Sequence, residues 1–245
     1  MLKKIARILI AAVAVGYALF AFAIIPSFSK EGKCKGVLVE ITGNSHEAMS
    51  REEIIEILTG EKLDPSGKGM KDFQCKEIEN CIGNISMVKE CQVYKSIGDY
   101  VKIEINCRKP IMKVFGNDGE SYCIDSEGNI IEGIQRALFL PVASGNIDRE
   151  SVSGDVTKVA NAINGSRFWS TLIEQIYLNE KGEFILIPRV GNHTIELGTA
   201  DNVDTKLQKL HTFYTEAMGT VGWNKYSKIN IEFNDKIVCT KREKK

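Results

Sequence analysis

The sequence lacks a net charge, and it lacks the residue groupings on which most catalytic and metal sites depend. Lysine plus arginine and aspartate plus glutamate number 32 each, so no field of the whole chain attracts nucleic acid or other polyanions. The three histidines, His46, His193 and His211, are isolated from one another, and neither H-x-x-x-H nor C-x-x-C occurs. These absences leave a zinc site without its usual ligand spacing.

Phosphate-binding and acyl-transfer motifs are absent as well. Gly67-Lys68-Gly69 is not a phosphate loop, because G-x-x-x-x-G-K-[ST] does not occur, and G-x-S-x-G is also missing. We therefore expect no catalytic residue, no cofactor and no metal. The sequence predicts a protein that is not an enzyme and that binds neither nucleic acid nor a small-molecule substrate.

The chain has instead a long uncharged run from Ile8 to Ile25. This run is long enough to cross a hydrocarbon core of about 30 Å, and Pro26 would end the helix. The alternative is a signal peptide cleaved after Ala23, although the apolar centre exceeds the usual length of ~7 to 15 residues. We predict an uncleaved transmembrane helix over residues 8–25.

The orientation of this span does not follow from the flanking charges, because basic residues stand on both sides of it. Long domains cross a membrane largely regardless of their charge, whereas the segment before the span is very short. We therefore expect residues 1–7 to form a cytoplasmic tail and the body of the chain to lie outside the cytoplasm.

Residues 26–108 hold a juxtamembrane stretch and a first folded unit. Val37–Thr42 alternates as a strand does, and the S-x-x-E pair of Ser50 and Glu53 predicts a helix from Arg51 to Leu58. A second helix is expected after Asp72, and two strands follow around the short loop 97–99. The order strand, helix, helix, strand, strand is typical of a POTRA-like module, a small extracytoplasmic docking domain.

Two of the seven cysteines face each other in this predicted hairpin. Cys91 and Cys107 stand eight positions on either side of Asp99, so a hairpin centred there places them on opposite strands. Their Cβ atoms would then be about 4.5–5.5 Å apart, and a disulfide would need only a modest adjustment. An oxidising compartment would permit that bond, while buried, inert thiols are the alternative.

Residues 109–240 read as a larger, mixed or antiparallel β-rich domain with a few helices, which gives an α+β fold for the whole chain. Helices are expected at Val156–Ile163, with Asp155 as a cap, and at about Val203–Met218. Residues 241–245 form a basic tail.

The stretch Asn117–Ile131, NDGESYCIDSEGNII, invites a calcium-loop interpretation because it is rich in acidic residues. Asp125, Glu127 and Gly128 do not keep the spacing of that loop. An Asp-Gly or Glu-Gly pair between apolar runs is a turn signal, because glycine accepts a positive φ without steric cost. We therefore predict two chain reversals with a short strand between them.

Several stretches of the chain resemble the FtsQ/DivIB family of bacterial cell-division proteins. RKPIMKVF is similar to the family's R-x-P-x-A-x-W opening of the β domain, YCIDSEGNII to its Y-hydrophobic-D-x-x-G hairpin, and KINIEFNDKIVCTK to its terminal hairpin. The sequence departs from the family at Val114-Phe115, where a Trp is usual. It departs again at Glu232-Phe233, where Arg-Tyr is frequent, so the contacts that Glu232 makes with a partner are open.

The resemblance implies a bitopic scaffold of the divisome in the bacterial inner membrane, with its N-terminus cytoplasmic and its body periplasmic at the division site. Its expected partners are membrane division proteins resembling FtsB and FtsL, and septal cell-wall synthases. Two alternatives are a secreted periplasmic binding protein or hydrolase, and a POTRA-bearing subunit of envelope assembly.

The residues expected to contact a partner lie in the terminal hairpin, Lys228–Thr240, with its turn at Asn234-Asp235 and with Ile229, Ile231 and Phe233 on one face. Its last strand, Lys236–Thr240, has no later strand to cover its outer edge, and such an edge is a template for strand addition. In FtsQ-like proteins this region receives a segment of FtsB. An ordinary edge, protected by Lys236, Lys241 and the basic tail, is the alternative. The candidate residues are Ile229, Ile231, Glu232, Phe233, Lys236, Ile237, Val238, Cys239 and Thr240.

Overall fold

The computed structural model describes Val13 and residues 32–43, 49–134, 138–233 and 235–243. The predicted span Ile8–Ile25 lies outside the described residues except for Val13. In the described part of the chain, no helix is both long and apolar enough to cross a bilayer. The chain divides into two compact units, the first ending near Ile105 and the second made mostly of Asn106–Lys245.

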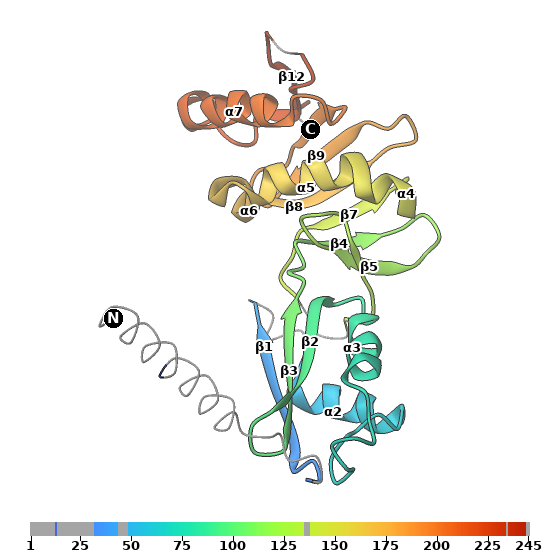
Figure 1. The fold of residues 1–245 in the computed structure, drawn as a ribbon. Coiled ribbons are helices and arrows are strands. Elements are labelled where there is room, and N and C mark those ends of the chain that lie inside the picture. The colour runs from blue at the N-terminus through green and yellow to red at the C-terminus, as the bar shows by residue number, and fades with distance from the viewer. Residues whose placement is uncertain (1–12, 14–31, 44–48, 135–137, 234, 244–245) are drawn as a thin grey trace, which may run out of the picture. The chain divides into compact units, whose positions relative to one another are not determined.

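The first unit is built around a three-stranded sheet with strand order β1-β3-β2 (Figure 1). Ile54 and Leu58 of α2, Ile78 of α3 and alternate residues of β3 are buried in its core. The predicted order of strand, helix, helix, strand, strand is therefore the order observed. The elements are β1 (Gly36–Thr42), α2 (Arg51–Gly60), α3 (Cys75–Gly83), β2 (Val88–Ser96) and β3 (Tyr100–Cys107).

The predicted disulfide between Cys91 and Cys107 is not formed, because Cys91 is a free thiol in the structure. Strand β2 ends at Ser96 and β3 begins at Tyr100, so the hairpin loop centres on Gly98 rather than on Asp99. A hairpin centred on Gly98 would place Ile105, rather than Cys107, opposite Cys91. Burial, with a smaller contribution from the nearby carboxylate of Glu79, raises the pKa of Cys91 to about 11, as expected of an unreactive thiol.

The second unit contains a nine-stranded mixed sheet with strand order β12-β11-β10-β9-β8-β7-β4-β5-β6 (Figure 1). Strand β7 is parallel to both of its neighbours and β10 is parallel to β11, whereas the other pairs are antiparallel. The strands are β4 (Met112–Phe115), β5 (Ser121–Ile124), β6 (Ile130–Ile131), β7 (Val142–Gly145), β8 (Ile173–Leu178), β9 (Phe184–Pro188), β10 (Thr194–Gly198), β11 (Tyr226–Asn230) and β12 (Val238–Lys241).

Helices cover one face of this sheet (Figure 1). They are α4 (Arg149–Ser151), α5 (Thr157–Asn164), α6 (Arg167–Leu172), α7 (Val203–Phe213) and α8 (Gly219–Val221), with the π-helical turns η1 (Val152–Val156) and η2 (Tyr214–Met218). Along β9 the buried Phe184, Leu186 and Pro188 alternate with half-buried residues, so the second face is partly open to solvent. The predicted α+β class, with a small N-terminal domain and a larger β-rich one, is confirmed.

The helix that we expected at Val156–Ile163 is α5 (Thr157–Asn164), but Asp155 does not cap it. Asp148 accepts a hydrogen bond from the amide of Ser151 and caps α4, which is followed by η1 and, after a kink at Gly154, by α5. The carboxylate of Asp155 instead pairs with Lys158 at 2.8 Å. Helix α6 was not predicted at all, although Ser166 caps it by accepting from the amide of Trp169.

The stretch Asn117–Ile131 forms two turns around the short strand β5, as predicted. The carboxylate of Asp125 is buried and accepts hydrogen bonds from the amides of Glu127 and Asn129, both at 2.9 Å. Arg108 Nη1 donates to Asp125 Oδ2 at 2.9 Å. Gly128 has a φ of +83°, and a Cβ there would lie 3.0 Å from Oγ1 of Thr157 on α5. The turn at Gly128 therefore packs closely against α5.

Candidate partner-binding edge

Strand β12 lies at one end of the nine-stranded sheet and pairs only with β11 among the described residues (Figure 1). Val238, Cys239 and Thr240 stand opposite Asn230, Ile229 and Lys228, in antiparallel register. No strand of the described part of the chain lies beside the outer backbone groups of β12, and an uncovered row of this kind is what strand addition requires.

The amide of Arg242 shows which backbone groups of β12 face outward, because it donates to the carbonyl of Lys225 at 2.9 Å. In an antiparallel pair, alternate residues direct their N–H and C=O groups toward the partner strand. The register shift in this pair adds its extra residue, Ser227, to β11, so the alternation along β12 is not interrupted, and Thr240 and Val238 face β11. Cys239 and Lys241 direct their N–H and C=O groups away from the sheet, where a further strand could pair with them.

The side chains of this terminal strand alternate as well. Ile237 and Cys239 are partly buried against the core of the unit. Val238 is 45% exposed, and Thr240 and Lys241 are also exposed. One face of the strand thus anchors it to the domain, while Val238 offers an apolar contact beside the open edge.

The predicted hairpin is correct in place and wrong in its details. Strand β11 ends at Asn230, so Ile231, Glu232, Phe233, Lys236 and Ile237 belong to the connection to β12 rather than to strands. The expected two-residue turn at 234–235 is replaced by this longer segment. Asn234 lies outside the described residues.

Alternation fails at Phe233, which was expected to share a buried face with Ile229 and Ile231. Both isoleucines are fully buried, whereas Phe233 is 43% exposed and lies under the Lys236 ammonium, 4.9 Å from the ring centroid. The chain leaves the strand geometry after the amide of Ile231 donates to the Glu196 carbonyl at 2.9 Å. Phe233 is therefore an exposed aromatic side chain in the connection that leads into β12.

Glu232 has a local structural role. Its side chain covers Gly198 at the end of β10, where an added Cβ would lie 2.7 Å from Glu232 Cγ. Gly198 has a φ of +73°, a conformation that glycine adopts at little cost. Glu232, which replaces the family's frequent Arg, thus packs its aliphatic part against β10. The residue as a whole is exposed to solvent.

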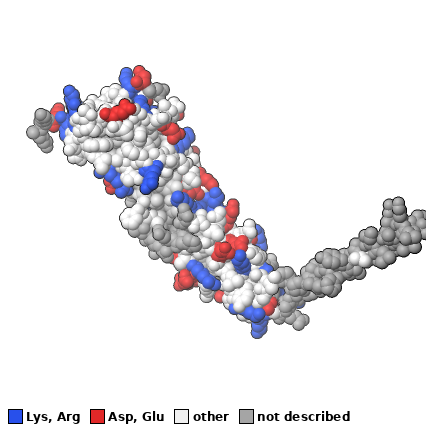
Figure 2. Space-filling view, turned by 90° about the vertical axis from the view of Figure 1, so that its left-hand side faces the viewer, with Lys and Arg blue, Asp and Glu red and all other residues white. Residues whose placement is uncertain are grey.

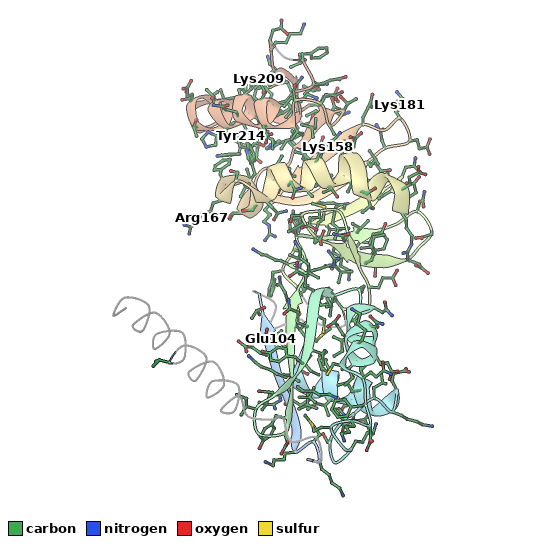
Figure 3. All side chains as sticks on the ribbon, viewed as in Figure 1. Glu104, Lys158, Arg167, Lys181, Lys209 and Tyr214 are labelled. Carbon is green, nitrogen blue, oxygen red and sulfur yellow. The ribbon has the colours of Figure 1, made fainter. Side chains whose placement is uncertain are left out.

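The residue that sequence reasoning missed is Lys209 of α7 (Figure 3). Its ammonium donates to the backbone carbonyls of Ile231, Phe233 and Lys236, all within the connection before β12. No motif marks a lysine for such a role. The only available signal was its place one turn after Lys206, on the buried side of an otherwise apolar helix face.

The described residues contain no group of three or more His, Cys, Asp and Glu side chains that could hold a metal ion. His193 is buried, and its Nε2 lies 2.6 Å from the hydroxyl of Tyr214. Burial, together with the positive charge of Arg242, lowers the pKa of His193. Basic and acidic side chains are interspersed on the face seen in Figure 2, without a continuous field of one sign.

Comparison with known families matches both parts of the chain. The model described as "FtsQ/DivIB, C-terminal related" matches residues 109–240. A POTRA-like domain model matches residues 32–106. No curated protein matches the chain.

Proposed function

The chain belongs to the FtsQ/DivIB family, and from this premise we propose that it is a bitopic scaffold of the bacterial divisome. In this proposal it links membrane partners for septal cell-wall synthesis through its extracytoplasmic domains. The family is one of non-enzymatic division proteins, so the protein acts by binding. Residues 8–25 anchor it in the inner membrane, with the N-terminus in the cytoplasm.

The observation that carries the proposal is the outer edge of β12. Cys239 and Lys241 present outward backbone groups, Val238 supplies exposed apolar surface beside them, and Phe233 supplies more in the connection that leads into β12. This combination suits a partner that adds an extended segment to the sheet, since main-chain hydrogen bonds supply affinity and side-chain contacts supply specificity. We assign the segment to a partner resembling FtsB, which acts together with a partner resembling FtsL.

The lysines near this edge are compatible with binding. Lys236 is directed over Phe233, and Lys228 pairs with Glu196 at 2.9 Å on the sheet face. Neither contact places an ammonium group on the outward N–H and C=O groups of β12. Of the groups that could protect the edge, Lys236 is thus engaged with Phe233, and we favour docking over an edge that is only protected.

Extraction of the full-length chain from membranes tests this function. We expect the FtsB-like and FtsL-like proteins to co-purify with it, and we expect its intact mass to include residues 1–25. A mature chain that begins just after Ala23 would contradict the membrane anchor. Recovery of the intact chain without either division protein would contradict the scaffold function.

A further inference from the structure

The ammonium of Lys209 is fully used by one segment of the backbone. Lys209 Nζ lies 3.3 Å from the carbonyl oxygen of Ile231 and 3.2 Å from that of Lys236, and it also donates to the carbonyl of Phe233. An ammonium group has three N–H donors. All three are thus directed at the connection between β11 and β12, which Lys209 holds from its position on α7 (Figure 3).

This connection determines where β12 lies. It leaves β11 after Asn230, and its first amide, that of Ile231, donates to Glu196 of the neighbouring strand. Its last residue, Ile237, packs against the core immediately before β12 begins. Between these two anchors, the Lys209 ammonium donates hydrogen bonds to carbonyls in both halves of the connection.

The surroundings of Lys209 act on its pKa in opposite directions. Burial lowers the pKa of Lys209, Lys206 lowers it further, and the carboxylate of Asp235 opposes both effects. Lys206 lies one turn earlier on α7, but its ammonium donates to the carbonyl of Thr199, in the segment between β10 and α7. The two lysines therefore fasten different segments, and Lys209 alone among them reaches the segment that leads into the edge strand.

We propose that Lys209 is a positioning residue that clamps the β11–β12 connection to α7 and so keeps β12 in the place and register that an added strand requires. The functional half of this inference rests on the proposed docking at β12. A strand that occupies its place only part of the time binds more weakly by the fraction of time it is correctly placed. Loss of the clamp should therefore weaken docking without removing any contact to the partner.

Substitution of Lys209 by Met keeps the length and the apolar stem of the side chain and removes the three donors. In Lys209→Met we expect hydrogen exchange of the Thr240 and Arg242 amides, which face β11, to become at least about tenfold faster, because the opened state is more populated. Amides of β8, on the far side of β9 and β10, should exchange as in the wild type. Lys158→Met on α5 is the matched control, because Lys158 is an exposed lysine paired with Asp155, and it should change neither strand.

Binding of the purified FtsB-like partner is measured on the same variants, and its dissociation constant should rise in Lys209→Met by a factor similar to that of the exchange rates. Unchanged exchange in β12 would overturn the clamp, whatever the partner does. Faster exchange with unchanged affinity would support the clamp and overturn docking at β12. If Lys209→Met does not fold, Lys209→Gln, which keeps two N–H donors, should give faster exchange than the wild type, and wild-type rates in that variant would overturn the clamp.

Discussion

Proline at Lys241 should weaken binding of the FtsB-like partner about tenfold to a hundredfold while leaving the domain folded. The N–H of Lys241 points away from β11, because the next residue, Arg242, donates to Lys225. Proline removes that donor and leaves a carbonyl of the added strand without its hydrogen bond, at a cost of about 1–3 kcal/mol. Proline is tolerated on an edge strand where its nitrogen faces solvent, so the free domain should lose little stability. The measurement is the dissociation constant of the purified partner, with the melting temperature of the free variant beside it.

Two matched variants separate the backbone from the side chain. Lys241→Ala removes the ammonium but keeps the N–H, and it should bind the partner nearly as the wild type does. Thr240→Pro removes an N–H that faces β11, so it should lower the stability of β12 in the free protein as well as the affinity. If Lys241→Pro folds and binds the partner with wild-type affinity, the partner does not pair with this edge.

Replacement of Asp125 by Ala should lower the free energy of unfolding by about 2–4 kcal/mol, because it leaves a half-buried Arg108 with only the more distant carboxylate of Glu127, 3.9 Å away. The same substitution deprives the amides of Glu127 and Asn129 of their acceptor. Asp118→Ala in the preceding turn is the matched control. Asp118 accepts from the amide of Glu120 at 2.9 Å in the same way but is exposed, so its loss should cost about 1 kcal/mol or less.

The pH dependence of this stabilisation has a defined sign. Burial alone would raise the pKa of Asp125, but the hydrogen bonds from Asn129, Arg108 and Glu127 outweigh it and lower that pKa below its ordinary value. A lowered pKa means that the stabilisation is present above the pKa of the unfolded state, about 3.9, and is lost as the pH falls through that of the folded state. Denaturant unfolding at pH 7 should therefore separate the wild type from Asp125→Ala strongly. The difference should shrink below about pH 4, and a constant difference down to pH 2 would contradict the assigned role of the carboxylate.

Much of the fold was predictable because it depends on local patterns. The alternation of apolar residues located β1, and glycine after Asp118 and Glu127 located the two turns around β5. The Ser-x-x-Glu pair located the beginning of α2 at Arg51. In each case the physical cause acts over a few residues, so the sequence carries it.

Long-range contacts were not predictable in the same way. The connection from Ile231 to Ile237 departs from a short hairpin because Lys209, far away in the sequence, collects its carbonyls. The short helical turn α4 at Arg149, capped by Asp148 and separated from α5 by a kink at Gly154, was also not predicted from the sequence. At the candidate edge, the sequence located the terminal strand, but only the amide of Arg242 showed which residues face outward.

Residue-specific hydrogen exchange of β12, with and without the FtsB-like partner, tests the central claim most directly. The outward amides of Cys239 and Lys241 should exchange fast in the free protein and become protected in the complex, whereas the amide of Thr240, already directed at β11, should change less. This pattern of alternate protection is what an added strand produces. A saturated complex in which the amides of Cys239 and Lys241 exchange as they do in the free protein would contradict docking at this edge.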